Sequence, residues 1–478
     1  MASLPSAQAA AGALSSRARS FAFATLIVAF VMDVLDSTIV NVAIPAIRGD
    51  LGAGAVAVQW MVAGYSTAFA MLLVSGGRMG DVFGYRRLVL IGMGGFTVAS
   101  VLCGLAQSPT QLIFARLAQG ATAACMAPQV VALVQVMFAP YERVRALSLF
   151  GLLGGVAAVA GPIVGGALIE ANIAGLGWRL IFLINLPIGL GGMIAAQRWL
   201  PAGRSPDPLR IDWVGNALSI AMVFAFVFPL VQGRSLGWPL WCEALLAATL
   251  PLALLLWRHL RIHTARTGSA LIDPALFRER SFSTGLLASL IFSTASGGFL
   301  LILTLMLQVG LGLDPLSAGL VHIPFAVGVS FGVAMLGRKI LPRLGRSVLT
   351  AGAAVMLLGM LALIVILANG SAIPAICAAL LVTGLGMGTC VGPLAPIALA
   401  RIDDRHAGSA GGMLKTVQQL GTAAGAASIG TLFLVAARGA TDPALTRTAF
   451  PAAALAICAM LTVVMLLSRR FPRQLFDV

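Results

Sequence analysis

The chain has 478 residues, of which 59% are hydrophobic and only 10% are charged, and its formal net charge is +15. Soluble globular domains carry about 25% charged residues, so this composition excludes an ordinary soluble protein. Its apolar runs are continuous rather than alternating over segments of about ten residues, which favours transmembrane helices over a membrane β-barrel.

Apolar runs long enough to cross a hydrocarbon core of about 30 Å recur along the whole sequence. Charged or Gly/Pro-rich breaks divide them into fourteen predicted transmembrane helices. These lie near residues 21–47, 55–76, 88–107, 111–138, 144–170, 178–199, 212–232, 239–258, 282–310, 316–337, 347–368, 373–400, 408–436 and 448–468. We therefore expect an all-α polytopic membrane protein.

Lys and Arg residues are distributed unevenly between the breaks. With a cytoplasmic N-terminus, 24 of the 31 fall on cytoplasmic segments, five fall outside and two lie within spans. The positive-inside rule then predicts that both termini are cytoplasmic and places the protein in the cytoplasmic membrane. Attraction to the anionic inner leaflet also explains the net charge, so we expect a lipid bilayer and no nucleic acid as partner.

The breaks suggest a 6+2+6 arrangement of the spans. A polar link after residue 200 and a basic segment before residue 282 separate two six-helix groups from a central pair. The expected parts are a cytoplasmic tail (1–20), an N-terminal bundle (21–200), a linker with two extra helices and a basic cytoplasmic loop (201–281), a C-terminal bundle (282–468) and a second cytoplasmic tail (469–478). Two helix bundles of equal size are typical of transporters, whose folds contain internal repeats.

Two carboxylates, Asp33 and Asp36, lie inside the first predicted span. Each costs about 2.5–3.5 kcal/mol at membrane depth, and three-residue spacing puts them on nearly the same helix face. Arg116 lies in the fourth span and cannot practically lose its proton, so it needs a carboxylate or substrate partner. Asp36 or Asp33 is the expected partner. The two aspartates are predicted to bind protons or cations, and Arg116 is predicted to tune the aspartate pKa and to help pass the proton. A purely structural ion pair is the alternative.

Three short sequence motifs lie in or between the predicted spans. Gly77, Asp81, Gly84 and Arg86 match the G-x-L-a-D-r-x-G-r-k loop of the major facilitator superfamily, although Met79, Val82 and Tyr85 depart from it. The run from Arg116 through Gln119 to Gly120 matches the R-x-x-q-G element of that superfamily. In the fifth span, an antiporter-type G-P-x-x-G-G element is matched by Gly161, Pro162, Gly165 and Gly166.

Three further stretches narrow the resemblance. They are residues 35–45, residues 178–189, and residues 407–410 with 418–421. Together with the motifs, they resemble the fourteen-spanner drug:proton antiporter family, over about residues 21–468. The resemblance implies that the loop at residues 77–86 gates the conformational change by latching the two halves. It also implies that the glycine element in the fifth span closes a leak path.

Other polar residues within spans are candidates for lining a substrate pocket. They are Asn41, Gln119, Gln308, His322, Gln418 and Gln419. His322 titrates near neutrality when unperturbed, but a hydrogen-bonded structural histidine is the commoner case. The six cysteines form no C-x-x-C pair and are expected to be buried apolar residues. We expect no metal, no cofactor and no catalytic residue, because no phosphate-binding loop, metal-ligand cluster or hydrolase arrangement is present.

The predicted function is proton-coupled efflux of amphipathic drugs or antibiotics, with cationic or aromatic compounds as the expected class, by alternating access and without enzyme activity. The proton gradient is the expected driving force, and a monomer is the expected functional unit. A dedicated exporter of one natural product is a second hypothesis, and a non-transporting sensor on a transporter fold is a third. Import of a solute is disfavoured by the glycine element. The sequence-based expectation is that Asp36→Asn abolishes coupled export while the protein still folds and inserts.

Overall fold

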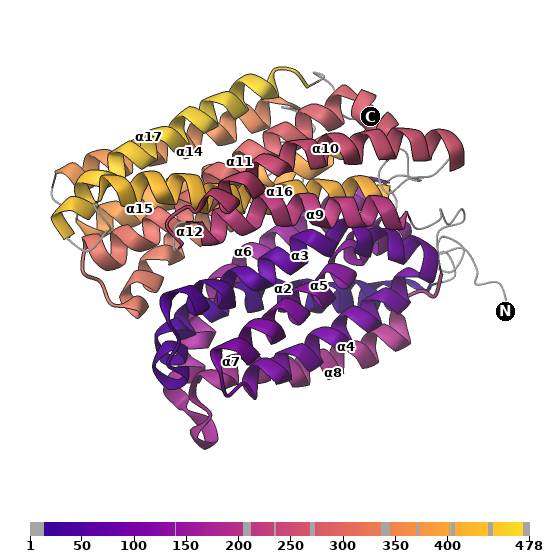
Figure 1. The fold of residues 1–478 in the computed structure, drawn as a ribbon, viewed down its shortest axis with the longest axis horizontal. Helices are drawn as coiled ribbons and strands as arrows, with labels where there is room; N and C mark the ends of the chain where they lie inside the picture. The colour runs from indigo at the N-terminus through magenta and orange to yellow at the C-terminus, as the bar shows by residue number, and fades with distance from the viewer. Residues whose placement is uncertain are drawn as a thin grey trace. The chain divides into compact units, whose positions relative to one another are not determined.

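A computed structural model describes most of the chain. The described residues are 14–138, 140–203, 212–233, 236–267, 273–335, 345–369, 372–400, 402, 407–437 and 443–471. Within these ranges the regular elements are all helices, as Figure 1 shows. The expected all-α architecture is therefore confirmed for the described part of the chain.

The helices form two compact units. Unit 1 contains Met1–Leu147, Ala160–Leu276 and Ile402–Thr416, and unit 2 contains Ser148–Val159, Phe277–Arg401 and Val417–Val478. The helices with most of their length in unit 1 are α2 (Ser16–Leu51), α3 (Ala55–Phe83), α4 (Tyr85–Gly104), α5 (Pro109–Met137), α6 (Pro140–Ala171), α7 (Leu180–Leu183), α8 (Asn185–Trp199), α9 (Trp213–Gln232) and α10 (Leu240–Thr267). The pair α9 and α10, which the sequence analysis set apart as a linker, thus belongs to unit 1.

Unit 2 is built mainly from the later helices. They are α11 (Arg280–Leu305), the π-helical turn η4 (Met306–Gly310), α12 (Pro315–Met335), α14 (Ser347–Ala368), α15 (Ile373–Leu399), most of α16 (Ala407–Ala436) and α17 (Pro443–Ser468). α15 packs against both α12 and α14. Its Gly384 and Gly388 face the backbone carbonyls of Phe325 and Val329 on α12, an approach that a side chain would prevent.

Local sequence explains where the unit 1 helices begin and end. The Ser15 hydroxyl accepts the Ala18 amide at the start of α2, and Gly52 ends that helix in the left-handed region at φ 62°. Ser108 caps α5 in the same way, directly before Pro109. These are ordinary N-cap and C-cap chemistries. α5 packs against α3 and α4, and α8 packs against α2 and α4, as can be followed in Figure 1.

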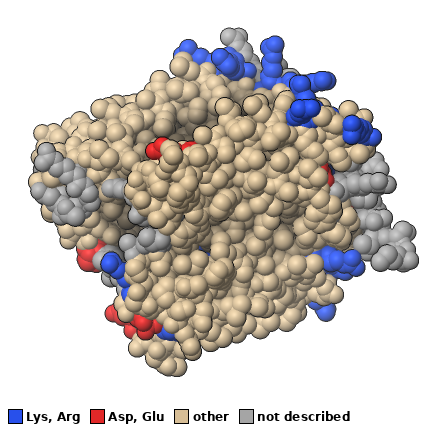
Figure 2. Space-filling view, viewed as in Figure 1, with Lys and Arg blue, Asp and Glu red and all other residues tan. Residues whose placement is uncertain are grey.

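The described helices agree in position with the predicted spans. Thirteen of them are long and apolar enough to cross a membrane. A long helix, α6, also occupies the fifth predicted span, but it is not among those thirteen. The exact count of fourteen and the orientation of the termini stay predictions. Figure 2 shows a face made almost wholly of side chains other than Lys, Arg, Asp and Glu, with most charged groups at its edges, as a lipid-facing surface requires.

The break between the second and third spans is shorter than the sequence suggests. The motif match predicts a loop over residues 77–86. Instead, α3 continues through Gly77 to Phe83, and only Gly84, at φ 99° and ψ 135°, separates it from α4. That backbone conformation is strained for any residue with a Cβ atom, so Gly84 alone makes the turn.

Candidate functional site: the Asp36 cluster

Asp36 lies at the centre of a fully buried polar cluster in unit 1. Its Oδ2 accepts a hydrogen bond from Arg116 Nη1 at 2.5 Å. Its Oδ1 accepts from Gln119 Nε2 at 2.8 Å and from Asn185 Nδ2 at 2.9 Å. Asp36 comes from α2, Arg116 and Gln119 from α5, and Asn185 from the first residue of α8. The predicted pairing of Arg116 with Asp36 is thus present, and it ties three helices together.

Arg116 has further partners besides the carboxylate. Its Nη1 also donates to Gln119 Oε1 at 2.7 Å, and its Nε donates to the Met61 carbonyl at 3.1 Å. The guanidinium lies 4.5 Å from the centre of the Tyr65 ring. Arg116 is only 1% exposed, so its charge is compensated inside the protein. Removing one member of such a buried pair typically costs about 3–5 kcal/mol of stability.

Asp33 has a different environment from Asp36, although it lies on the same helix. It is half-buried, and its Oδ1 accepts a hydrogen bond from the Tyr65 hydroxyl. Among the described ion pairs, none involves Asp33, whereas Asp36 pairs directly with Arg116. Tyr65 links the two sites, since its hydroxyl bonds Asp33 while its ring contacts Arg116. The structure therefore places one carboxylate in a closed ion pair and leaves the other more accessible.

The surroundings of the cluster are apolar. Buried side chains packed around it include Ile39, Val40, Met61, Cys103 and Phe182. In such surroundings electrostatic interactions are stronger than in water, and an unpaired charge is costly. A change in the charge of either aspartate therefore changes the forces that act on α2, α3 and α5, which is what a coupling site requires.

Two residues of the cluster were missed by the sequence analysis. Asn185 bonds Asp36 and also the Ser100 hydroxyl on α4, at 3.0 Å, and Tyr65 bonds Asp33. Asn185 lies in the stretch of residues 178–189 that carries part of the family resemblance, which is the only sequence signal that marked it. Tyr65 has no comparable signal, because a lone tyrosine in an apolar run is more often a packing residue.

Gln119 requires a correction. From its sequence position we expect it in the substrate pocket, but it is 0% exposed and both ends of its side-chain amide bond within the cluster. It holds Asp36 and Arg116 together instead of facing a substrate. The prediction failed because a glutamine three residues after Arg116 follows the same helix face, and only the packing of α2 against α5 shows what covers that face.

The glycine element of α6 packs against α2 close to Asp36. A Cβ atom on Gly161 would collide with Thr38 and come within 3.1 Å of the Ile39 amide nitrogen, and a Cβ atom on Gly165 would lie 2.7 Å from Ile39 Cγ1. Gly166 differs, because its nearest neighbour would be Val42 Cγ1 at 4.0 Å. The side chain of Pro162 lies outside the described residues. Two of the three predicted glycines are thus required for close approach to the helix that carries both aspartates.

The residues of the predicted gating loop also have defined partners. Asp81 accepts a hydrogen bond from the Tyr85 hydroxyl at 2.9 Å, and its second oxygen lies 3.9 Å from Arg78 Nη1. Arg86 Nη1 donates to the Leu200 carbonyl at 3.4 Å, at the end of α8. Gly77 is buried within α3. These contacts join α3, α4 and the segment after α8 within unit 1.

The remaining pocket candidates are spread along the chain. Gln308 is exposed on η4, and His322 on α12 is half-buried with its Nδ1 bonded to the Ala318 carbonyl at 2.7 Å. Gln418 and Gln419 are half-buried on α16. The side chain of Asn41 lies outside the described residues. Among the described side chains of this set, no hydrogen bond joins one candidate to another.

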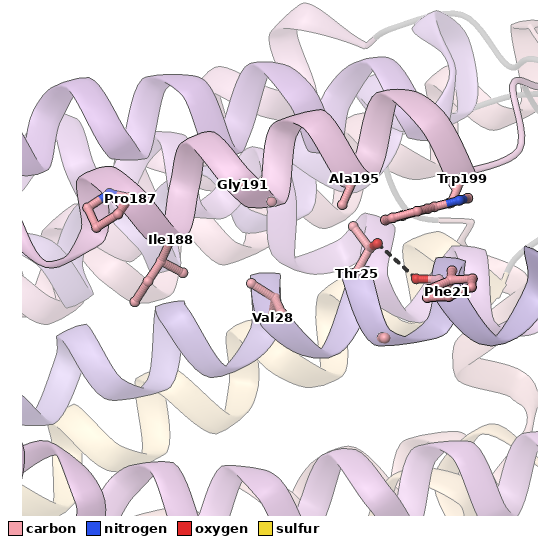
Figure 3. Close-up of a pocket in the computed structure, with 10 residues that line it drawn as sticks. Phe21, Thr25, Val28, Pro187, Ile188, Gly191, Ala195 and Trp199 are labelled. Atoms are coloured by element: carbon pink, nitrogen blue, oxygen red, sulfur yellow. Dashed lines mark hydrogen bonds between the residues drawn. The ribbon is translucent and has the colours of Figure 1, made fainter.

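A surface groove of about 340 Å³ lies between α2 and α8. In Figure 3, Phe21, Thr25 and Val28 line the groove from α2, and Ile188 and Trp199 line it from α8. Phe21 and Trp199 stack at its end, with ring centroids 4.8 Å apart. Its lining has no ionisable side chain, so it is a surface for apolar groups and not the coupling site.

Sequence comparison identifies related proteins. Residues 26–426 match the family described as the Major Facilitator Superfamily. The chain is 42% identical over 427 residues to the "Probable actinorhodin transporter" of Streptomyces coelicolor. This alignment covers 89% of this chain and 74% of that protein. It is also 31% identical over 422 residues to "Multidrug resistance protein Stp" of Mycobacterium tuberculosis. This second alignment covers 86% of this chain and 75% of the relative.

Solved structures show the same fold. The human organic anion transporter MFSD10 aligns with a TM-score of 0.64 over 93% of this chain and 99% of its own, at 14% identity. The proton:xylose symporter XylE aligns with a TM-score of 0.65 over 94% and 96% of the two chains, at 12% identity. With the family match, the relatives above 30% identity and the many apolar helices, the chain is a multi-pass membrane protein that belongs to the major facilitator superfamily.

Proposed function

We propose that this protein exports amphipathic small molecules across the cytoplasmic membrane in exchange for protons, with cationic or aromatic compounds as the expected substrates. The observation that carries the proposal is the arrangement of two carboxylates on α2, one closed in a buried pair with Arg116 and one half-buried beside Tyr65. The names of the relatives support export, since they include a multidrug resistance protein and a probable actinorhodin transporter.

The two aspartates have different proposed roles. Asp33 is the more accessible carboxylate, and we assign to it the exchange of a proton for a cationic substrate. Asp36 holds Arg116, Gln119 and Asn185, and its ion pair responds to the charge on Asp33 through Tyr65. The membrane potential favours proton entry by about 2.3 kcal/mol per 100 mV for each charge moved. The proton gradient then drives export by alternating access, with no cofactor and with a monomer as the working unit.

A dedicated exporter of a single natural product is the second candidate. It is favoured by the 42% identity to a protein named for the transport of one compound, actinorhodin. A resistance panel in cells that express the protein separates the two candidates, because protection against one compound alone supports the narrow exporter. A non-transporting sensor predicts no substrate flux in the same assays.

Replacing Asp33 with asparagine is the direct test of the coupling role. In proteoliposomes with an imposed pH gradient, we expect the wild type to move protons when a lipophilic dye cation is added. Asp33→Asn is expected to lose this proton movement and to keep wild-type thermal stability, because no described ion pair is broken. Tyr65→Phe removes the hydroxyl that bonds Asp33 but keeps the ring beside Arg116, so a partial loss is expected.

The matched control is Asp50→Asn, the same substitution near the end of α2. Asp50 is exposed and pairs with Arg179 at 2.7 Å, far along the helix from the cluster. It is expected to retain dye-induced proton movement. Wild-type proton movement in Asp33→Asn overturns the assignment of the exchanging carboxylate to Asp33. Substrate flux without proton movement in the wild type overturns proton coupling itself.

A further inference from the structure

Three side chains able to bind a metal converge where α9 begins and α10 nears its end. Among the described residues, Asp212, His259 and His263 each offer a ligand atom, and these atoms lie within 4.8 Å of one another. All three belong to unit 1, and none takes part in the Asp36 cluster. No metal site was expected from the sequence, which does not reveal this set because Asp212 lies almost fifty positions from His259 and His263.

The two histidines share one face of α10. They are four residues apart, and their rings stack with centroids 5.3 Å apart and planes inclined by 22°. Histidines at i and i+4 on a helix can bind one metal ion together, as they do in the H-E-x-x-H arrangement. Both side chains are half-buried, so an ion can reach them from the protein surface without unfolding of the helix.

Asp212 completes the set from the start of α9. Its Oδ1 lies 2.8 Å from His259 Nε2 and also accepts the Gly215 amide at 2.8 Å, as the N-cap of the helix. A carboxylate binds a metal ion in its ionised form.

The chemistry of the ligands selects the class of metal. Two imidazoles and one carboxylate suit Zn²⁺ and similar first-row ions, with ligand distances of about 2.0–2.2 Å. Mg²⁺ and Ca²⁺ prefer sites made of oxygen ligands. A bound ion would replace the proton between Asp212 and His259, and the ligand nitrogen of His263 lies within 4.8 Å of both of their ligand atoms. Arg78 interacts electrostatically with Asp212, and its charge moderates the affinity for a cation.

We propose that Asp212, His259 and His263 bind a divalent first-row transition metal, with Zn²⁺ as the representative ion, and that this ion fastens the start of α9 to α10. The three ligands leave one tetrahedral position for water. The ion joins two helices that already pack against each other and that meet at the Asp212–His259 contact. The proposal concerns the stability of the α9–α10 pair and does not depend on the proposed transport function.

The test is calorimetric titration of the purified full-length protein in detergent, free of any polyhistidine tag, with Zn²⁺ and separately with Mg²⁺. One Zn²⁺ per chain is expected, without saturable binding of Mg²⁺. Residues that hydrogen-bond to a metal ligand, without binding the metal, contribute about 10–100-fold to metal affinity. Loss of a ligand itself has a larger effect, so His263→Gln is expected to weaken Zn²⁺ binding at least about 100-fold. Zn²⁺ is also expected to raise the melting temperature of the wild type but not of His263→Gln.

Two further variants keep the test independent of folding defects. Asp212→Asn retains an N-cap residue but loses the charge, so it is expected to fold and to bind Zn²⁺ more weakly. His322→Gln removes one imidazole elsewhere in the chain and is expected to bind like the wild type. Absence of saturable Zn²⁺ binding by the wild type overturns the proposal. Wild-type affinity in His263→Gln also overturns it, because Asp212 and His259 would then form only a structural ion pair.

Discussion

Asp36→Asn is expected to reduce substrate-induced proton movement in proteoliposomes to the level of liposomes without protein. The substitution leaves the shape of the side chain nearly unchanged but removes the charge that compensates Arg116, with which Asp36 pairs at 2.5 Å. An uncompensated buried charge costs several kcal/mol. Asparagine still offers an oxygen to Arg116, so the loss of stability is expected near or below the lower end of the range of about 3–5 kcal/mol.

A double variant separates the coupling role of Asp36 from its structural role. Asp36→Asn combined with Arg116→Gln removes both charges, so thermal stability in detergent is expected to recover relative to the single variant. Proton movement is expected to stay absent, because the charge pair is lost. If the double variant transports protons like the wild type, the pair is structural and coupling lies elsewhere. Proton movement retained in Asp36→Asn alone leads to the same conclusion.

Gly161→Ala is expected to be the second most damaging change, although it adds only one methyl group. That methyl would collide with Thr38 and approach the backbone of Ile39 on α2, so α2 and α6 must separate. Overpacking of this kind costs about 1–3 kcal/mol, more than the gain of about 1 kcal/mol from replacing glycine within a helix. Because Thr38 lies two residues after Asp36, the shift also disturbs the cluster, and export is expected to fall strongly.

Gly166→Ala is the matched control within the same motif. Its Cβ atom would meet only Val42 Cγ1 at 4.0 Å, so there is room for the methyl group. The gain in helix propensity is expected to leave this variant as stable as the wild type or slightly more stable. Melting temperatures and dye export in reconstituted vesicles compare the two variants. Equal behaviour of Gly161→Ala and Gly166→Ala would contradict close packing of α6 on α2.

The candidate site was partly visible in the sequence. A carboxylate or guanidinium in an apolar run is costly unless it is paired, and this rule alone linked Arg116 to Asp36 or Asp33. It could not choose between the two, because both aspartates lie on nearly one face of α2. Only the rotation and depth of α2 against α5 show that Asp36 is paired and that Asp33 bonds Tyr65.

Two predictions were wrong because they depended on contacts between helices. Gln119 follows Arg116 by three residues and has no sequence feature that shows whether it faces substrate or Asp36. Residues 77–83 carry turn-forming glycine and charge, but the structure continues α3 through them. Local preferences are weak there relative to packing, and contacts such as that between Arg86 and Leu200 lie far apart in the sequence.

The sequence motifs indicated the family by resemblance. The sequence by itself also determined the helical membrane class, the positions of the helices and the charged residues that need partners. It did so because the lengths of apolar runs and the cost of buried charge are local properties of the chain. The tertiary structure alone decided that Asn185 and Gln119 close around Asp36, that Gly161 and Gly165 allow α6 onto α2, and that Asp212 meets His259 and His263. These contacts join different helices, and their geometry is fixed by how closely the helices can pack.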